Sequence, residues 1–114
     1  MRTIYKICPA SAWREAERQG VFRGSPVDVS DGYIHFSTAS QVEETARKHF
    51  AGQTGLVLLR LDTAALGAAL KWEPSRGGAL FPHLYGPLPC GLVETVTEIA
   101  LGADGAPQLG DLEA

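Results

Sequence analysis

The sequence predicts an α+β domain with a mainly antiparallel sheet, split or strongly curved, and two principal helices packed against it. Two observations lead to this class. Both clear helical patterns fall within residues 9–50, whereas short apolar or alternating runs typical of strands fill most of residues 56–101. Consecutive strands without helices between them favour antiparallel pairing, because a parallel pair needs a long crossover connection.

Length and composition limit the kind of protein. The 114 residues fit a single domain with one modest core, and composition predicts a mobile tail at about residues 103–114. A hydrophobic content of 45% excludes a disordered chain, and a formal net charge of -3 argues against non-specific nucleic-acid binding. No apolar run approaches the roughly 20 residues of a membrane span. The N-terminus does not resemble a signal peptide, so we expect a cytoplasmic protein.

The chain begins with a predicted strand, a helix and a loop. The strand covers residues 2–8, and the helix runs from about Pro9 to Gln19 and ends at Gly20. Residues 23–30 have no clear period and are predicted as a loop over or beside a cleft. Lys6 interrupts the apolar pattern of the strand. It is either an edge lysine that extends into solvent or a charge that faces a cleft.

The segment DGYIHFSTASQ, residues 31–41, is the most informative stretch. Residues 33–36 are predicted as a strand, and Thr38 and Gln41 have the spacing of a capping box that starts a helix running to about residue 50. A helix start directs backbone N–H groups and a partial positive charge to one place. His35 and Ser37 lie beside it, which predicts a site for an anionic or other small ligand.

Strands dominate the second half of the chain. Residues 56–61 are apolar on both faces and are therefore predicted as a central strand. Asp62 or Thr63 is expected to cap a short helical turn, and residues 70–73 and 92–101 are predicted as strands. Pro82 argues against a central strand in residues 80–85, because proline lacks the N–H that a ladder needs.

Neither the cysteines nor the histidines have the spacing of a metal site, so no metal is expected. Cys8 and Cys90 are expected to be free and buried. The alternative is a nucleophilic Cys8, activated by Lys6 two residues away.

The motifs IYKI, DGYIHFST, KWE and FPHLYG resemble a small bacterial family, domain of unknown function 952, over residues 4 to about 98. That family is regarded as a distant relative of the ADP-ribosyltransferase fold, so the resemblance implies this architecture and an NAD pocket. Lys6 then matches the position of a ribose-binding histidine, and His35 lies in the second motif. Glu73 and the pair His83 and Tyr85 are candidates for the third motif.

We predict that the histidines of both main motifs line one concave site, together with Ser37 and Tyr85. Both segments place hydrogen-bonding side chains among strongly apolar neighbours, and such groups need partners or water. A shared, wet cleft satisfies both. If NAD is bound, the residues expected to hold it are Lys6, His35, Ser37, Thr38, Arg76 and Tyr85.

Three functions follow from these residues. The first is a nucleotide or NAD pocket, with Glu73 stabilising an oxocarbenium-like state if nicotinamide leaves. The second is a non-catalytic module for a small anionic metabolite. The third is a small hydrolase with His35 or His83 as general base.

Overall fold

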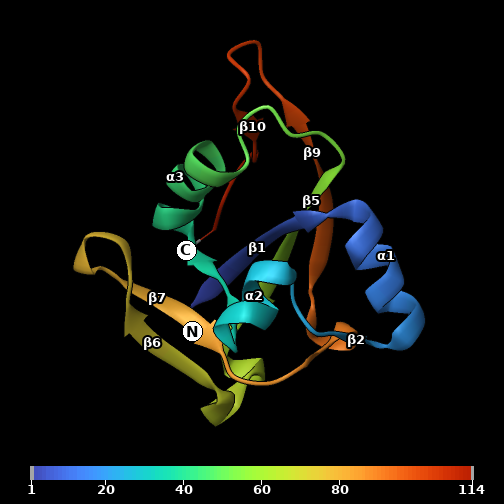
Figure 1. Ribbon diagram of the computed structural model, residues 1–114, viewed down its shortest axis with the longest axis vertical. Coiled ribbons are helices and arrows are strands. Elements are labelled where there is room, and N and C mark those ends of the chain that lie inside the picture. The colour runs from blue at the N-terminus through green and yellow to red at the C-terminus, as the bar shows by residue number, and fades with distance from the viewer. Residues whose placement is uncertain (1, 114) are drawn as a thin grey trace.

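The computed structural model describes residues 2–113, apart from the side chain of Arg76. Three α-helices surround antiparallel sheets in this range (Figure 1). The helices are α1 (Ala10–Gln19), α2 (Pro26–Asp31) and α3 (Ala39–His49). The predicted α+β class with antiparallel pairing is confirmed.

The strands form one large sheet and two smaller ones. The five-stranded sheet has the order β10-β9-β5-β1-β4, the three-stranded sheet the order β3-β7-β6, and β2 pairs with β8. The bounds of the large sheet are β1 Thr3–Pro9, β4 Ser37–Thr38, β5 Leu56–Asp62, β9 Thr95–Leu101 and β10 Pro107–Gln108. Those of the smaller sheets are β2 Val21–Phe22, β3 Ile34–His35, β6 Leu70–Pro74, β7 Leu80–Leu84 and β8 Leu88–Pro89.

Apolar side chains on both faces of the large sheet form two cores. The first core packs around Ile4, Trp13 and Leu59, and the second around Tyr5, Val42 and other residues of β1, β5 and α3. Helices α1 and α3 therefore cover opposite faces of the sheet, as Figure 1 shows. Strand β5 is in the middle of this sheet, which confirms the central strand predicted from its apolar residues.

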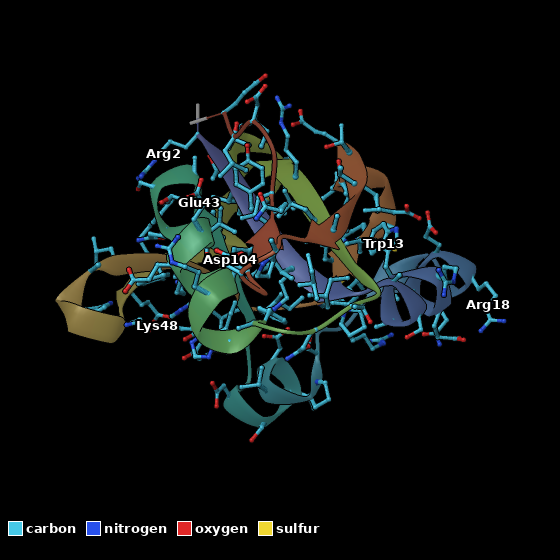
Figure 2. The ribbon with its side chains drawn as sticks, turned by 90° about the horizontal axis from the view of Figure 1, so that it is seen from above. Arg2, Trp13, Arg18, Glu43, Lys48 and Asp104 are labelled. Carbon is cyan, nitrogen blue, oxygen red and sulfur yellow. The ribbon has the colours of Figure 1, made fainter. Side chains whose placement is uncertain are left out.

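The two predicted helices begin and end where their local signals indicate. Helix α1 follows Pro9 and ends at Gly20, whose φ of 82° is the left-handed conformation that glycine adopts without strain. Figure 2 shows Arg18 at the outer side of α1, whereas Trp13 lies on the side facing the rest of the domain. Helix α3 begins after a capping box, in which the Thr38 N–H donates to Gln41 Oε1 at 3.0 Å.

The predicted loop at residues 23–30 is wrong, because it contains α2. A capping box of Ser25 and Asp28 starts this helix, and Pro26 occupies its first turn. The Ser25 N–H donates to Asp28 Oδ2 at 2.7 Å. With only six residues, α2 is too short to show a helical period in the sequence.

The strand predicted at residues 33–36 divides at Phe36. Before this residue, β3 pairs with β7, with His35 opposite His83; after it, β4 pairs with β1, with Thr38 opposite Ile4. The chain thus passes from the small sheet to the large sheet within a few residues, and α3 follows directly.

Strand β7 is the central strand of the small sheet, contrary to the expectation from Pro82. The N–H and C=O of one residue lie on the same side of an antiparallel strand. The C=O of Pro82 accepts a hydrogen bond from the Phe36 N–H at 3.0 Å, so the proline nitrogen faces Phe36 too. The missing N–H therefore costs no bond to β6.

The end of the chain also differs from expectation. The last long strand begins at Thr95 instead of residue 92, because residues 90–92 form a 3₁₀ turn. After Gly102 the chain returns as β10, and the Glu113 N–H donates to the Tyr5 hydroxyl at 2.8 Å. The segment lies against the large sheet, while its mobility stays a prediction.

Candidate functional site

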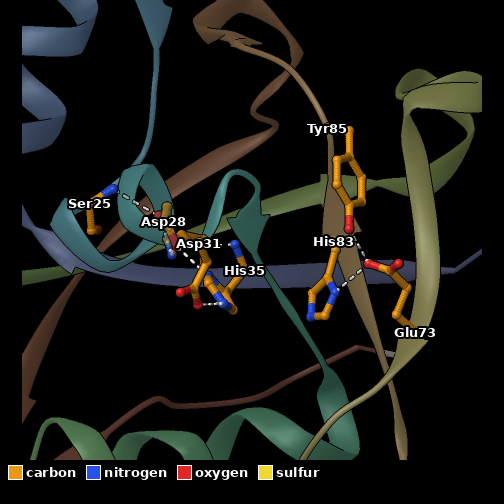
Figure 3. A network of polar contacts seen from close by, with 8 residues as sticks. Ser25, Asp28, Asp31, His35, Glu73, His83 and Tyr85 are labelled. Atoms are coloured by element: carbon orange, nitrogen blue, oxygen red, sulfur yellow. Dashed lines mark hydrogen bonds and ion pairs between the residues drawn. The ribbon is translucent and has the colours of Figure 1, made fainter.

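A buried cluster of charges joins α2 to both main sheets. The Lys6 ammonium on β1 lies 2.8 Å from Asp28 Oδ2, and His35 Nδ1 on β3 lies 2.6 Å from Asp28 Oδ1. The His35 backbone N–H also donates to Asp28 Oδ1 at 3.2 Å. On the other side of the imidazole, Nε2 lies 3.0 Å from Asp31 Oδ2, as Figure 3 shows. One aspartate thus anchors a lysine, a histidine and a short helix.

Asp28 is ionised although it is almost fully buried. Burial raises the pKa of its carboxyl, but the hydrogen bond from His35, the charge of Lys6 and the Ser25 N–H outweigh this and lower the pKa to about 2. The Lys6 side chain is only 7% exposed. Lys6 is therefore not an edge lysine that extends into solvent: it lines the cavity described below, and its charge is paired with Asp28.

A second cluster lies on the small sheet. Glu73 Oε1, on β6, lies 2.8 Å from His83 Nδ1 on β7 and accepts a hydrogen bond from the Tyr85 hydroxyl, also at 2.8 Å (Figure 3). The bonds from His83 and then Tyr85 lower the pKa of the Glu73 carboxyl, and the same bond raises the pKa of Tyr85. His83 is buried, with 4% of its side chain exposed, so this carboxylate determines the orientation of the imidazole.

Aromatic rings connect the two clusters. Tyr33 packs against three of them, with ring centroids 4.7 Å from His35, 4.2 Å from His83 and 5.1 Å from Tyr85. The centroids of His35 and His83 are 5.4 Å apart, in an edge-on arrangement. The register of β3 and β7, with these histidines opposite each other, places both rings on the same face of the small sheet.

A cavity of about 610 Å³ lies beside these rings. All three histidines of the chain line it, and apolar side chains form most of its wall. Its polar lining includes Lys6, Ser37 and Thr45, and the two hydroxyls of Ser37 and Thr45 are 3.1 Å apart. An apolar cavity of this size with a few convergent polar groups is typical of small-molecule sites.

The structure brings together some of the predicted site residues and not others. Lys6, His35, Ser37 and His83 line the cavity. Thr38, Glu73 and Tyr85 are outside its lining. Thr38 caps α3 and bonds Ser40, while Tyr85 follows the end of β7 and turns its hydroxyl to Glu73. The prediction that Tyr85 lines the same concave surface is therefore wrong.

Glu73 reaches the cavity only through His83. The prediction for the Arg76 side chain lies outside what the structure describes. Four residues of the site were not predicted as part of it: Asp28, Asp31, Tyr33 and His49. The S-x-x-D spacing of Ser25 and Asp28 was the one local signal for Asp28.

Cys8 and Cys90 are free, as predicted. Burial raises the pKa of the Cys8 thiol to about 11, and the charge of Lys6 offsets this only in part. Such a thiol is a poor nucleophile at neutral pH, which contradicts the alternative of an activated Cys8. Cys90 is only half-buried, because its 3₁₀ turn lies at the surface of the first core.

Residues 2–113 contain neither a cluster of metal-binding side chains nor a helix that could cross a membrane. No three His, Cys, Asp or Glu side chains in this range are grouped so that they could hold a metal ion. None of the helices described has the length and hydropathy to cross a membrane.

These features define a small α+β domain with a split antiparallel sheet and a histidine-lined cavity. The chain matches the model of the family described as "Protein of unknown function (DUF952)" over residues 7–96, and it belongs to that family. The resemblance of the sequence motifs to this family is thus confirmed. No curated protein matches the chain.

Solved structures of one bacterial protein are similar over almost the whole chain. The crystal structure of protein CC0527 from Caulobacter crescentus has a TM-score of 0.92 and 53% identity, covering 95% of each chain. Its V27M/L66M double mutant has a TM-score of 0.92 and 51% identity over the same share of each chain. The solution NMR structure has a TM-score of 0.87 and 53% identity, covering 96% of this chain and 95% of that one.

Proposed function

We propose that this chain is a small-molecule-binding domain whose cavity takes a ligand of the nucleotide or NAD type. The observation that carries the proposal is the cavity of about 610 Å³, in which all three histidines and several hydroxyls meet mainly apolar walls. Its volume is within the range of roughly 300–1,000 Å³ that is usual for drug-sized ligands.

Two features support a nucleotide-type ligand over other small molecules. The imidazole rings of His35 and His83 line the cavity and provide planar groups against which a base or a nicotinamide ring can stack. The second is the distant relationship of the family to the ADP-ribosyltransferase fold, which the resemblance of the motifs implies. The loop at Arg76 follows Ser75, which lines the cavity, and is our candidate for contact with a phosphate.

Binding is favoured over ADP-ribosyl transfer by the position of Glu73. A carboxylate that stabilises an oxocarbenium-like state has to face the reacting sugar. Glu73 instead bonds His83 and Tyr85 and is not part of the cavity lining. Its role in this proposal is to orient His83.

A second candidate function rests on the bond between Glu73 and His83. A carboxylate that orients an imidazole is the usual partner of a general base, so a small hydrolase with His83 as base is the alternative. His35 is less suited to this role, because both of its ring nitrogens already face carboxylates.

Thermal-shift measurements and isothermal titration with NAD, ADP-ribose and nicotinamide test the proposal. We expect at least one of them to raise the melting temperature. Replacing His35 or His83 by Gln should weaken that ligand, while the remote surface variant Thr54→Ala should not. The proposal fails if none of the three compounds binds. Release of free nicotinamide from NAD would show that the protein is an enzyme and not only a binder.

A further inference from the structure

We propose that the cavity wall formed by β3 and β7 recognises an uncharged hydroxyl group of the ligand, which donates a hydrogen bond to Nε2 of His83, and that this wall does not bind an anion. The inference rests on the proposed function only in assuming that the cavity holds a ligand. It names the chemistry that the ligand presents to this wall.

The first step concerns the proton on His83. An ionised carboxylate only accepts hydrogen bonds, so His83 Nδ1, 2.8 Å from Glu73 Oε1, carries a proton. Tyr85 donates to the same oxygen and holds the carboxylate in place. Within residues 2–113 the structure records no carboxylate or carbonyl partner for Nε2 of this 4% exposed side chain. In the neutral imidazole with its proton on Nδ1, Nε2 is the acceptor.

The second step concerns the direction of that acceptor. The ring of Tyr33 packs at 4.2 Å from His83 and the ring of His35 at 5.4 Å, so neighbours restrict rotation of the imidazole. Turning the ring over would also break the bond to Glu73. Figure 3 shows Nε2 at the edge of the ring away from Glu73. Since His83 lines the cavity, the ligand meets a pre-oriented acceptor.

The third step is that the basic side chains on this wall already have carboxylate partners. His35 Nδ1 faces Asp28, and its Nε2 faces Asp31. Each ring nitrogen therefore already has a carboxylate partner, and neither is left as an acceptor for the ligand. The Lys6 ammonium is bound to both oxygens of Asp28. An anion at this wall would have to compete with two carboxylates that are already in place.

The helix start that we expected to attract an anion is also partly satisfied. The Thr38 N–H donates to the side chain of Gln41, and the Thr38 side chain accepts from the backbone N–H of Gln41. The remaining strong feature of this wall is therefore a neutral acceptor. A ligand that buries it without offering a donor leaves it unsatisfied, which should weaken binding on the order of tenfold or more.

NMR of the imidazole nitrogens tests the inference on the wild-type protein without a known ligand. Because the chain has three histidines, spectra of His35→Gln and His49→Gln assign the signals of His83 by elimination. At neutral pH we expect His83 to be protonated at Nδ1 alone. A proton on Nε2 would overturn the inference.

Four probes then test what the acceptor binds. Adenosine and ethylene glycol should both move the His83 Nε2 signal in the direction of an accepted hydrogen bond. A trideoxy analogue of adenosine that lacks all three ribose hydroxyls, and inorganic phosphate, should not. A response to phosphate alone, or no response to either hydroxyl probe, would refute the proposal. A response to ethylene glycol without nucleotide binding would instead reject only the nucleotide-type ligand.

The variant Glu73→Gln tests whether the Glu73 carboxylate selects the tautomer of His83 or only supports the fold. A carboxamide can donate to Nδ1 as well as accept from it, so the variant should populate the opposite tautomer of His83 and weaken adenosine binding about tenfold. Tyr85→Phe is the matched control, because it removes a donor to Glu73 but leaves the carboxylate that selects the tautomer. An unchanged His83 spectrum in Glu73→Gln would contradict this mechanism.

Discussion

Replacing the buried Asp28 by Asn should destabilise the fold more than any other single carboxylate-to-amide change near the cavity. The substitution keeps the shape of the side chain and removes its charge. The Lys6 ammonium, 7% exposed, then loses the anion 2.8 Å away, and the His35 Nδ1–H loses a charged acceptor. An unpaired buried charge is the costly product of this change.

Two arguments give the expected decrease in the free energy of unfolding of Asp28→Asn. A pKa lowered from 3.8 to about 2 corresponds to about 2 kcal/mol of stability at neutral pH. Removing one partner of a buried ion pair costs roughly 3–5 kcal/mol. Urea denaturation at pH 7 should therefore show that Asp28→Asn lowers the free energy of unfolding by roughly 2–5 kcal/mol.

The ion pair of Lys6 and Asp28 also makes the stability depend on pH, and Asp31→Asn provides a matched control. Because the folded-state pKa of Asp28 is depressed, its contribution is complete above pH 3.8 and is lost as the pH falls towards about 2. The difference in the free energy of unfolding between wild type and Asp28→Asn should therefore narrow over that pH interval. Asp31→Asn, at a half-exposed carboxylate, should cost less than about 1 kcal/mol.

A double-variant cycle separates the pair from the general effect of the substitution. Lys6→Met in the Asp28→Asn background removes the unpaired charge, so the double variant should be more stable than the sum of the single changes predicts. The reasoning would be refuted if Asp28→Asn stayed within about 0.5 kcal/mol of wild type, as an ordinary surface substitution does.

Three further outcomes are expected. Thr38→Ala should cost about 1 kcal/mol through the lost helix cap, whereas Thr54→Ala should leave the melting temperature unchanged; equal effects would argue against the cap. Cys8, with a pKa raised to about 11, should resist iodoacetamide in the native protein at pH 8 and react after unfolding; rapid native labelling would contradict its burial. Tyr5→Phe should speed hydrogen exchange of the Glu113 amide, and an unchanged rate would mean that the tail does not dock through this hydroxyl.

Local signals explain why both long helices could be located from the sequence. Pro9 and Gly20 determine the ends of α1 through their own backbone preferences, and Thr38 with Gln41 starts α3 through hydrogen bonds within four residues. The central position of β5 followed from its apolar residues on both faces. None of these features needs a distant partner.

Residues that depend on distant partners were harder to predict. Lys6 was recognised as unusual, but its partner Asp28 is 22 positions away in a segment predicted as a loop. Pro82 was correctly regarded as unable to donate to a ladder. The sequence did not reveal that its nitrogen would face the point where β3 ends, where no ladder bond to β6 is lost.

The fold class, the long helices and the two polar motifs around His35 and His83 could be predicted from the amino-acid sequence, because propensity, capping and periodicity act over a few residues. The folded structure was needed to show that Phe36 separates two sheets, that Glu73 orients His83, and that Lys6 and His35 already have a carboxylate partner. Those results depend on strand register and burial, which bring together residues far apart in the chain.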